Sequence, residues 1–149
     1  MIRRPPRSTQ GVSSAASDVY KRQALSKAIN SGLVKTAHDC SEGGVGVAVA
    51  EMCIGGRTGA NIDLDGTGDE SIWARLWGES LGRIIIAVSP ENEKQFLDIM
   101  SGNITTYLGE VTESQLLTIS DGYEEVISTN VQQMVDSWQG TLDMTGGEI

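Results

Sequence analysis

The sequence is poor in the residues that build disulfide frameworks and zinc sites. Its 149 residues include two cysteines and one histidine. Two cysteines, Cys40 and Cys53, are not enough for a disulfide framework, and their spacing is not that of a zinc site. They therefore indicate a chain with reduced thiols. No second histidine is present to activate either thiol. We therefore interpret both cysteines as small core residues.

Long hydrophobic runs are also missing. No apolar stretch approaches the roughly 20 residues that a transmembrane helix needs. No apolar segment follows Arg3 and Arg4, so the start does not have the pattern of a secretory signal peptide. These absences lead us to expect a cytoplasmic protein with no membrane partner.

Positive charge is scarce. The chain has 11 Lys and Arg against 20 Asp and Glu, a formal net charge of −9. Such a balance disfavours a nucleic-acid or anionic-membrane surface, so we expect no nucleic-acid partner. It does not exclude ATP, because Mg²⁺ and backbone amides can hold the phosphates. The hydrophobic fraction of 39% is typical of a globular protein, and the length fits one domain with a sizeable core.

The first 23 residues differ in composition from the rest of the chain. They are rich in Arg, Ser and Pro, show no apolar period, and carry five of the 11 basic residues. A flexible basic tail and a targeting presequence are two interpretations. We favour a third, because the stretch resembles translated sequencing-adapter sequence. We predict a non-native or disordered leader over 1–23, a domain over 24–139 and a frayed tail over 140–149.

Residues 36–59 organise the chain and read TAHDCSEGGVGVAVAEMCIGGRTG. An extended segment, a polar turn and an apolar helix in this order present a carboxylate and backbone N–H groups to a phosphate or a metal-bound phosphate. Asp39 suits Mg²⁺, Ser41 suits a phosphate, and His38 is a candidate general base. The alternatives are that Asp39 and Ser41 only cap the helix and that His38 is structural.

The apolar part of this stretch fits two kinds of structure. Val45, Val47 and Val49 alternate as in a strand. Val45, Val49 and Met52 lie at helical spacing instead. The length of the segment 43–54 favours a helix, because few strands are that long.

The rest of the chain alternates strand and helix patterns without a strict β-α-β rhythm. We predict strands over 33–37, 60–64, 83–88, 107–111 and 116–120, and helices over 24–30, 71–77 and 131–138 and after Ser89-Pro90. The unbroken apolar run at 83–88 predicts a strand covered on both faces. In the last helix, the spacing predicts that Trp138 faces inward. The pattern indicates an α+β fold, a mixed β-sheet with helices packed on it.

A second polar group lies before the strand predicted at 83–88. Glu79, Ser80 and Arg83 offer a carboxylate, a hydroxyl and a guanidinium. These groups can bind a polar ligand, or can form a salt bridge at the end of a loop. The acids at 63–70 do not have the spacing of a calcium-binding EF-hand, so we interpret them as a solvated turn.

Taken together, the motifs resemble a known family. The turn HD-x-S-E-GG leads into AEM, LWGES-x-GR follows at 76–83, and LGEV lies at 108–111. Over about 24–138 this combination is similar to phosphoribosylformylglycinamidine synthase of purine biosynthesis. The match is to its second, C-terminal synthetase-type unit, of the aminoimidazole-ribonucleotide-synthetase-like superfamily. The resemblance implies the α+β fold of the C-terminal domain of aminoimidazole ribonucleotide synthetase.

The resemblance also implies a ligase. In that family, ATP phosphorylates the amide oxygen of formylglycinamide ribonucleotide, and ammonia from glutamine then displaces phosphate. The implied ligands are Mg²⁺ and ATP or ADP, with Asp39 as the metal ligand and Ser41 as the nucleotide contact. The family's catalytic histidine, ATP lysine and glutaminase cysteine belong to segments absent from this sequence. We therefore assign no catalytic residue: His38 is not the family's catalytic histidine, and Cys40 stands at a variable position.

These implications make the chain a domain of a larger enzyme, inactive alone. Its expected partners are the remaining domains of the parent synthase and a glutaminase domain or subunit. A sister enzyme of the superfamily, such as aminoimidazole ribonucleotide synthetase, selenophosphate synthetase or a thiamine-phosphate kinase, is the nearest alternative, and the HD-x-S-E-GG turn disfavours it. A purely structural docking module is a further alternative, which would show no Mg²⁺-dependent ADP binding.

Overall fold

The structure, a computed structural model, describes residues 14–65, 67–68 and 71–140. The chain forms two compact units. The first unit comprises Met1–Glu42 and Glu79–Tyr107, and the second comprises Gly43–Gly78 and Leu108–Ile149. The predicted leader over 1–13 and the predicted tail over 141–149 lie outside the described residues.

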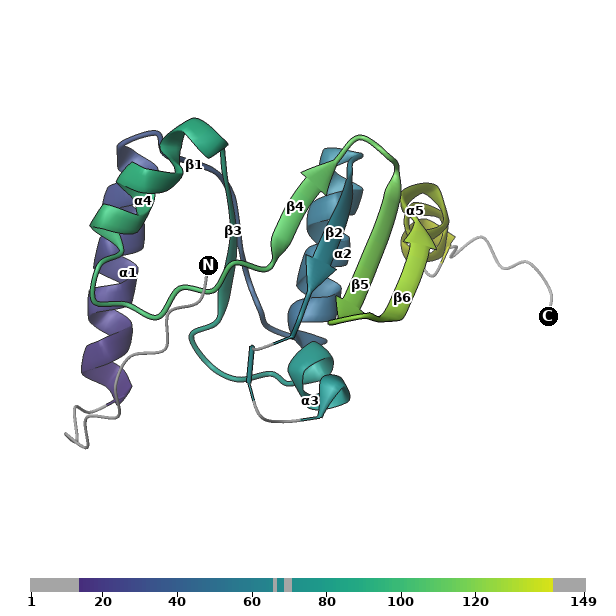
Figure 1. Cartoon of the computed structure of the whole chain (residues 1–149), viewed down its shortest axis with the longest axis horizontal. Helices are drawn as coiled ribbons and strands as arrows, with labels where there is room; N and C mark the ends of the chain where they lie inside the picture. Colours follow the sequence, from purple (N-terminus) through teal and green to yellow (C-terminus); the bar gives the residue numbers. More distant parts are fainter. Residues whose placement is uncertain (1–13, 66, 69–70, 141–149) are drawn as a thin grey trace. The chain divides into compact units, whose positions relative to one another are not determined.

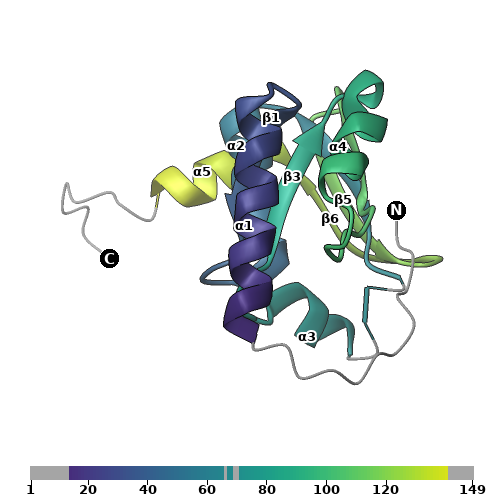
Figure 2. The ribbon, with the colours of Figure 1, turned by 90° about the vertical axis from the view of Figure 1, so that its left-hand side faces the viewer.

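The first unit is a two-stranded sheet with helices on one side. It contains α1 (Ser14–Asn30), β1 (Val34–Asp39), β3 (Ile84–Val88), the 3₁₀ helix η1 (Pro90–Asn92) and α4 (Glu93–Ile99). β1 and β3 pair antiparallel, with a register shift between Val34 and Thr36. α1 and α4 lie on the same side of the two strands (Figure 1). α1 runs alongside β3 (Figure 2).

The core of the first unit lies between these helices and one face of the strands. Leu25 and Ala28 of α1 are buried, as are Phe96 and Met100 at α4. Each pair is three or four residues apart, so it occupies one face of its helix. Partly buried apolar residues complete the core: Ala24, Val34, Ile84, Ile86, Val88, Leu97 and Ile99.

The first helix is longer than the sequence predicts. α1 begins at Ser14, so the predicted boundary at 23 falls inside a helix, and the disorder predicted for 14–23 is wrong. An ion pair of 3.2 Å joins Lys21 Nζ to Asp18 Oδ1 within this part of α1. Helix formation also propagates easily from a packed segment such as the turns around Leu25. The non-native origin of the leader stays a prediction.

β3 is less covered than its apolar sequence predicts. Every residue of Ile84–Val88 is only half-buried. Ile84, Ile86 and Val88 pack against the core cluster of α1 and α4, and Ile85 and Ala87 do not belong to that cluster. The prediction of cover on both faces is therefore wrong for this unit.

The second unit is a mixed four-stranded sheet with helices. It contains α2 (Gly44–Gly56), β2 (Gly59–Asp63), α3 (Ile72–Trp77), β4 (Gly109–Thr112), β5 (Leu116–Asp121), β6 (Glu124–Asn130) and α5 (Val131–Gly140). The strand order is β4-β2-β5-β6; β2 and β5 are parallel, and the other neighbours are antiparallel. Figure 1 shows α2 behind this sheet. The predicted α+β class with a mixed sheet is confirmed.

The segment with two possible structures is a helix. α2 runs from Gly44 to Gly56, as its length favoured, and Val45 and Val49 are buried. Its N-cap is Gly43, with φ at 76° and no side-chain cap hydrogen bond. Neither Asp39 nor Ser41 caps α2, so the capping alternative is wrong. Helix capping therefore does not explain why Asp39 and Ser41 stand in this turn.

The start of α2 is covered by the end of α3. A Cβ added at Gly44 would lie 2.7 Å from the Leu76 carbonyl oxygen and 2.9 Å from that of Gly78. A Cβ at Gly46 would lie 2.4 Å from the Trp77 ring. Small residues thus permit close packing here. The carbonyl oxygens beside Gly44 are hydrogen-bond acceptors, so they disfavour an anion at the start of α2.

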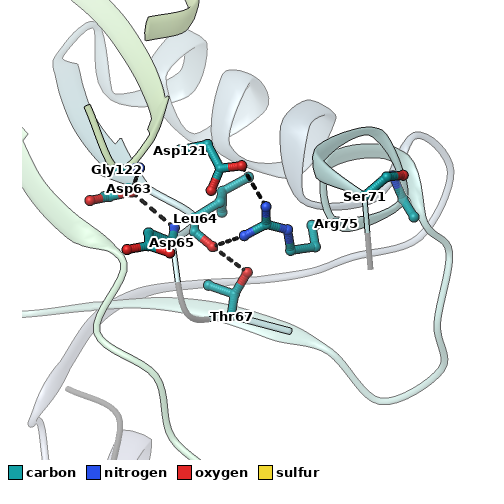
Figure 3. Close-up of polar contacts among 9 residues, drawn as sticks. Asp63, Leu64, Asp65, Thr67, Ser71, Arg75, Asp121 and Gly122 are labelled. Carbon is teal, nitrogen blue, oxygen red and sulfur yellow. Dashed lines mark hydrogen bonds and ion pairs between the residues drawn. The ribbon is translucent and has the colours of Figure 1, made fainter. Parts of the chain in front are cut away.

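An arginine on α3 ties together three parts of the second unit (Figure 3). Arg75 Nη2 donates to Asp121 Oδ2 at 2.6 Å, at the end of β5. Arg75 Nη1 donates to the Leu64 carbonyl oxygen at 2.5 Å, and the Thr67 hydroxyl donates to the same oxygen at 2.7 Å. Asp63 Oδ1 accepts from the N–H groups of Asp65 and Gly122. The acidic turn is therefore hydrogen-bonded to the sheet.

The last helix departs from its prediction at one position. Val131 and Val135 of α5 are buried, but Trp138 is 58% exposed. The prediction that Trp138 faces inward is wrong, because the buried stripe of α5 ends at Val135. Among the described residues, no helix is long and apolar enough to cross a membrane.

Candidate functional site

The predicted ligand turn follows β1 in the first unit. Asp39, the last residue of β1, pairs with Ile84 of β3. The Cys40 N–H donates to the Arg83 carbonyl oxygen at 2.9 Å, which extends the pairing by one residue. These contacts hold the turn beside the segment that precedes β3. Asp39 and Ser41 are exposed, so a carboxylate and a hydroxyl are presented at this point.

A cavity of about 590 Å³ adjoins the turn. Its walls come from the first half of α1, the turn after β1 and the loop before β3, all within the first unit. The lining residues are Asp18, Lys21, Arg22, Asp39, Cys40, Ser41, Glu42, Glu79, Leu81, Gly82, Arg83 and Ile84. The volume lies within the range of roughly 300–1,000 Å³ typical of small-molecule sites. Two motifs that are distant in sequence, HD-x-S-E and GES-x-GR, therefore share one cavity.

The cavity carries charges of both signs. The cations are Lys21, Arg22 and Arg83, and the acids are Asp18, Asp39, Glu42 and Glu79. Lys21 Nζ also donates to the Gly82 carbonyl oxygen at 2.9 Å, which joins α1 to the loop before β3. Cations suit phosphate oxygens, and carboxylates suit a hard divalent cation. A metal-bound phosphate matches this mixture better than a simple anion does.

The two cysteines are core residues, as predicted. Cys40 and Cys53 are buried and free. Burial raises the pKa of the Cys40 thiol, and the Arg83 cation offsets this only in part. Burial also raises the pKa of Cys53. Both thiols therefore stay protonated at neutral pH, whereas a nucleophilic cysteine needs a lowered pKa.

The carboxylates of the cavity fit magnesium rather than zinc or calcium. Within the part of the chain that the structure describes, no three His, Cys, Asp or Glu side chains are grouped closely enough to hold a metal ion. Mg²⁺ usually takes one or two protein carboxylates and fills its other positions with water and phosphate oxygens. Asp39, Glu42 and Glu79 all line the cavity, so the one or two carboxylates that Mg²⁺ usually takes are available there.

Two of the candidate residues lie elsewhere. His38 and Ser80 are not among the residues that line the cavity. His38 Nδ1 lies 2.7 Å from the Asp39 carbonyl oxygen. A carbonyl oxygen only accepts, so Nδ1 carries the proton in this contact. His38 thus has a structural contact, in agreement with the alternative given for it above.

The sequence of the chain matches a described protein family over residues 7–122: AIR synthase related protein, C-terminal domain. This range is most of the chain. The chain belongs to this family. The matched range also includes much of the segment that the composition marks as a leader.

This chain is similar to solved structures of Thermotoga maritima PurL. PurL complexed with FGAR matches with a TM-score of 0.73 and 26% identity, over 83% of this chain and 21% of that chain. PurLQS matches with 0.73 and 25% identity, over 85% of this chain and 23% of that chain. Phosphoribosylformylglycinamidine synthase II matches with 0.70 and 25% identity, over 83% of this chain and 22% of that chain. The chain therefore spans about a fifth of the length of these structures.

The cavity contains residues that the sequence alone did not indicate. Asp18, Lys21 and Arg22 come from the segment that its composition assigned to a leader. The one sequence signal for them was the spacing of Asp18 and Lys21, which suits an ion pair on a helix. The predicted candidates Asp39 and Ser41 do line the cavity, together with Glu79 and Arg83 of the second polar group.

Proposed function

We propose that this chain serves as the C-terminal synthetase-type domain of a phosphoribosylformylglycinamidine synthase. The observation that carries the proposal is the shared cavity, in which the HD-x-S-E turn and the GES-x-GR loop meet. Membership of the AIR synthase related family and the similarity to PurL point to the same enzyme. The parent reaction would be the ATP- and glutamine-dependent conversion of formylglycinamide ribonucleotide to the amidine.

Within this proposal, the cavity holds part of a magnesium nucleotide. Asp39 supplies a carboxylate oxygen to Mg²⁺, and Ser41 donates a hydrogen bond to a phosphate oxygen. Structures of T. maritima PurL complexed with ATP and with ADP resemble this chain, which supports a nucleotide as the ligand. Bound Mg²⁺ would neutralise phosphate charge, and the chain's own groups would bind and orient the nucleotide. No residue of this chain is assigned a catalytic role.

The partners follow from the same proposal. They are the remaining domains of the synthase and a glutaminase domain or subunit that supplies ammonia. The proposal places the enzyme in the cytoplasm, with neither nucleic acid nor membrane as a partner.

Replacement of one carboxylate tests the nucleotide site. Asp39→Asn keeps the shape of the side chain and removes its charge, so Mg²⁺-dependent ADP binding to the intact synthase should weaken about tenfold or more, a loss of about 1.4 kcal/mol. Binding is measured by calorimetric titration with and without Mg²⁺. The matched control is Asp98→Asn, because Asp98 is an exposed residue of α4 that does not line the cavity.

The control should bind ADP as the wild type does. Equal ADP affinity for Asp39→Asn and wild type, in the presence of Mg²⁺, would remove Asp39 from the metal site. Capping does not complicate this result, because the N-cap of α2 is Gly43.

A purely structural docking module remains the alternative of a different class. It is favoured by the exposed apolar side chains of the second unit, Trp73 at 59% and Trp138 at 58%. The same titration separates the two proposals, since a docking module binds no ADP in either the presence or the absence of Mg²⁺.

A further inference from the structure

The two-stranded sheet of the first unit is incomplete as a sheet. Among the described residues it consists of β1 and β3 only, and each strand has one edge without a neighbour. A two-stranded sheet is marginally stable in water, and three or more strands are the usual requirement. One of these edges is therefore a candidate for pairing with a strand that comes from outside the chain.

The two edges differ in chemistry. β1 contains Lys35 and Asp39, and a register shift lies between Val34 and Thr36. Charged residues and bulges are the features by which natural proteins protect an edge that stays free. β3 reads IIIAV and has no charge, no proline and no register shift apart from its end at Val88. The free edge of β3 thus has the composition of an interior strand.

The register shows which backbone groups lie on the free edge of β3. Cys40 N–H donates to Arg83 C=O, so these opposed residues form a hydrogen-bonded pair. In an antiparallel ladder, such pairs alternate with pairs that are not hydrogen-bonded. Since His38 is opposite Ile85, the backbone groups of Ile85 face β1. Those of Ile84 and Ile86 face away from β1, toward the free edge.

The side chains agree with an interior position. Ile84 and Ile86 pack toward the core with α1 and α4. Ile85 and Ala87, on the opposite face, are half-buried. An additional strand beside β3 would widen both faces and cover part of this apolar surface, besides satisfying the backbone groups of Ile84 and Ile86.

We propose that an extended segment of the parent synthase polypeptide, outside this chain, pairs with the free edge of β3. The chain spans only about a fifth of the PurL structures that it resembles, so most of such a parent lies outside it. This inference rests on the proposed function only for the existence of a larger parent polypeptide. A second copy of this chain is the competing occupant, and it is an outcome of the test.

Amide hydrogen exchange tests the edge in the isolated chain. Residue-resolved NMR at several protein concentrations should find that Ile85 and Ala87, which face β1, exchange roughly tenfold or more slowly than Ile84 and Ile86. Because Ile85 and Ala87 belong to the same strand, they are the internal control for local unfolding. Slow exchange of all four amides at every concentration would show that the edge is already paired within the chain and would overturn the proposal.

The same amides are then compared in the intact synthase without nucleotide. The proposal expects the exchange of Ile84 and Ile86 to slow to the rate of Ile85. Unchanged fast exchange in the synthase would refute it. Protection that rises with concentration in the isolated chain would assign the edge to a second copy instead. Because no nucleotide is present, these results do not depend on whether Asp39 binds Mg²⁺.

Discussion

At the scale of single residues, Gly43, Gly44 and Asp39 have separate roles in the polar turn between β1 and α2. Gly43 and Gly44 both have a left-handed φ, at 76° and 61°, and Gly43, not Asp39, is the N-cap of α2. The Asp39 side chain is therefore not used in the helix cap and stays at the cavity wall. The sequence pattern allowed Asp39 to be a helix cap or a metal ligand. The structure separates the two roles, because the N-cap of α2 is Gly43, with its positive φ.

Gly44 should be sensitive to an added methyl group. A left-handed φ costs an L residue about 1–2 kcal/mol, and in Gly44→Ala the new Cβ would also meet backbone atoms of Leu76 and Gly78 within 3 Å. We expect Gly44→Ala to lose about 1–3 kcal/mol more unfolding free energy than the matched control Gly122→Ala. Gly122 has φ at 63°, and the nearest neighbour of its Cβ is Asp65 at 3.7 Å. Urea unfolding of both variants gives the two values.

A similar loss in the two variants would mean that the backbone strain, which they share, is the whole effect. In that case the packing of α3 against the start of α2 would carry no stability.

At the scale of elements, the periodic segments were predictable and their surroundings were not. The strands at β1, β2, β3 and β5 and the helix α2 lie within a few residues of their predicted bounds. α1 was missed over 14–23, because a helix can form without its own apolar period when a neighbouring turn packs. The cover of β3 was overpredicted, because a run of apolar residues does not indicate how many strands or helices the same chain can place beside it.

The site was predictable to a similar extent. Asp39 and Ser41 stand out by residue type and by their place at a strand end, and both line the cavity. The sequence could not indicate that Glu79 and Arg83 share that cavity, because only the pairing of β1 with β3 brings the two segments together.

The ion pair of Arg75 on α3 should stabilise the second unit. The Arg75 and Asp121 side chains are 10% and 28% exposed, so their contact is partly shielded from water. Asp121→Asn leaves the guanidinium with one charged partner fewer, and we expect a loss of about 1–3 kcal/mol of unfolding free energy. Asp136→Asn is the control, because Asp136 on α5 is exposed and a change there should stay within about 0.5 kcal/mol.

Denaturant unfolding monitored by tryptophan fluorescence reports on this unit, which contains Trp73, Trp77 and Trp138. An Asp121→Asn variant as stable as the control would show that the ion pair between Arg75 and Asp121 adds no stability to this unit.

At the scale of the whole molecule, the chain divides into two compact units that carry different features. The cavity lies in the first unit. The second unit holds the larger sheet and the covered start of α2. An enzyme that binds ATP, a ribonucleotide and ammonia needs several sites. The matched region is only about a fifth of the similar PurL structures, which is consistent with further sites in the rest of such a parent.

We therefore expect no synthase activity from this chain alone. Given ATP, Mg²⁺, ammonia and formylglycinamide ribonucleotide, it should release no phosphate and form no amidine, whereas the intact synthase should do both under identical conditions. The physical reason is that the proposed function gives Asp39 and Ser41 only a part in nucleotide binding, and it assigns no residue of this chain to activate the substrate amide. Supplying ammonia directly removes the glutaminase from the comparison. Amidine formation by the chain alone would refute its assignment as one domain of a larger enzyme.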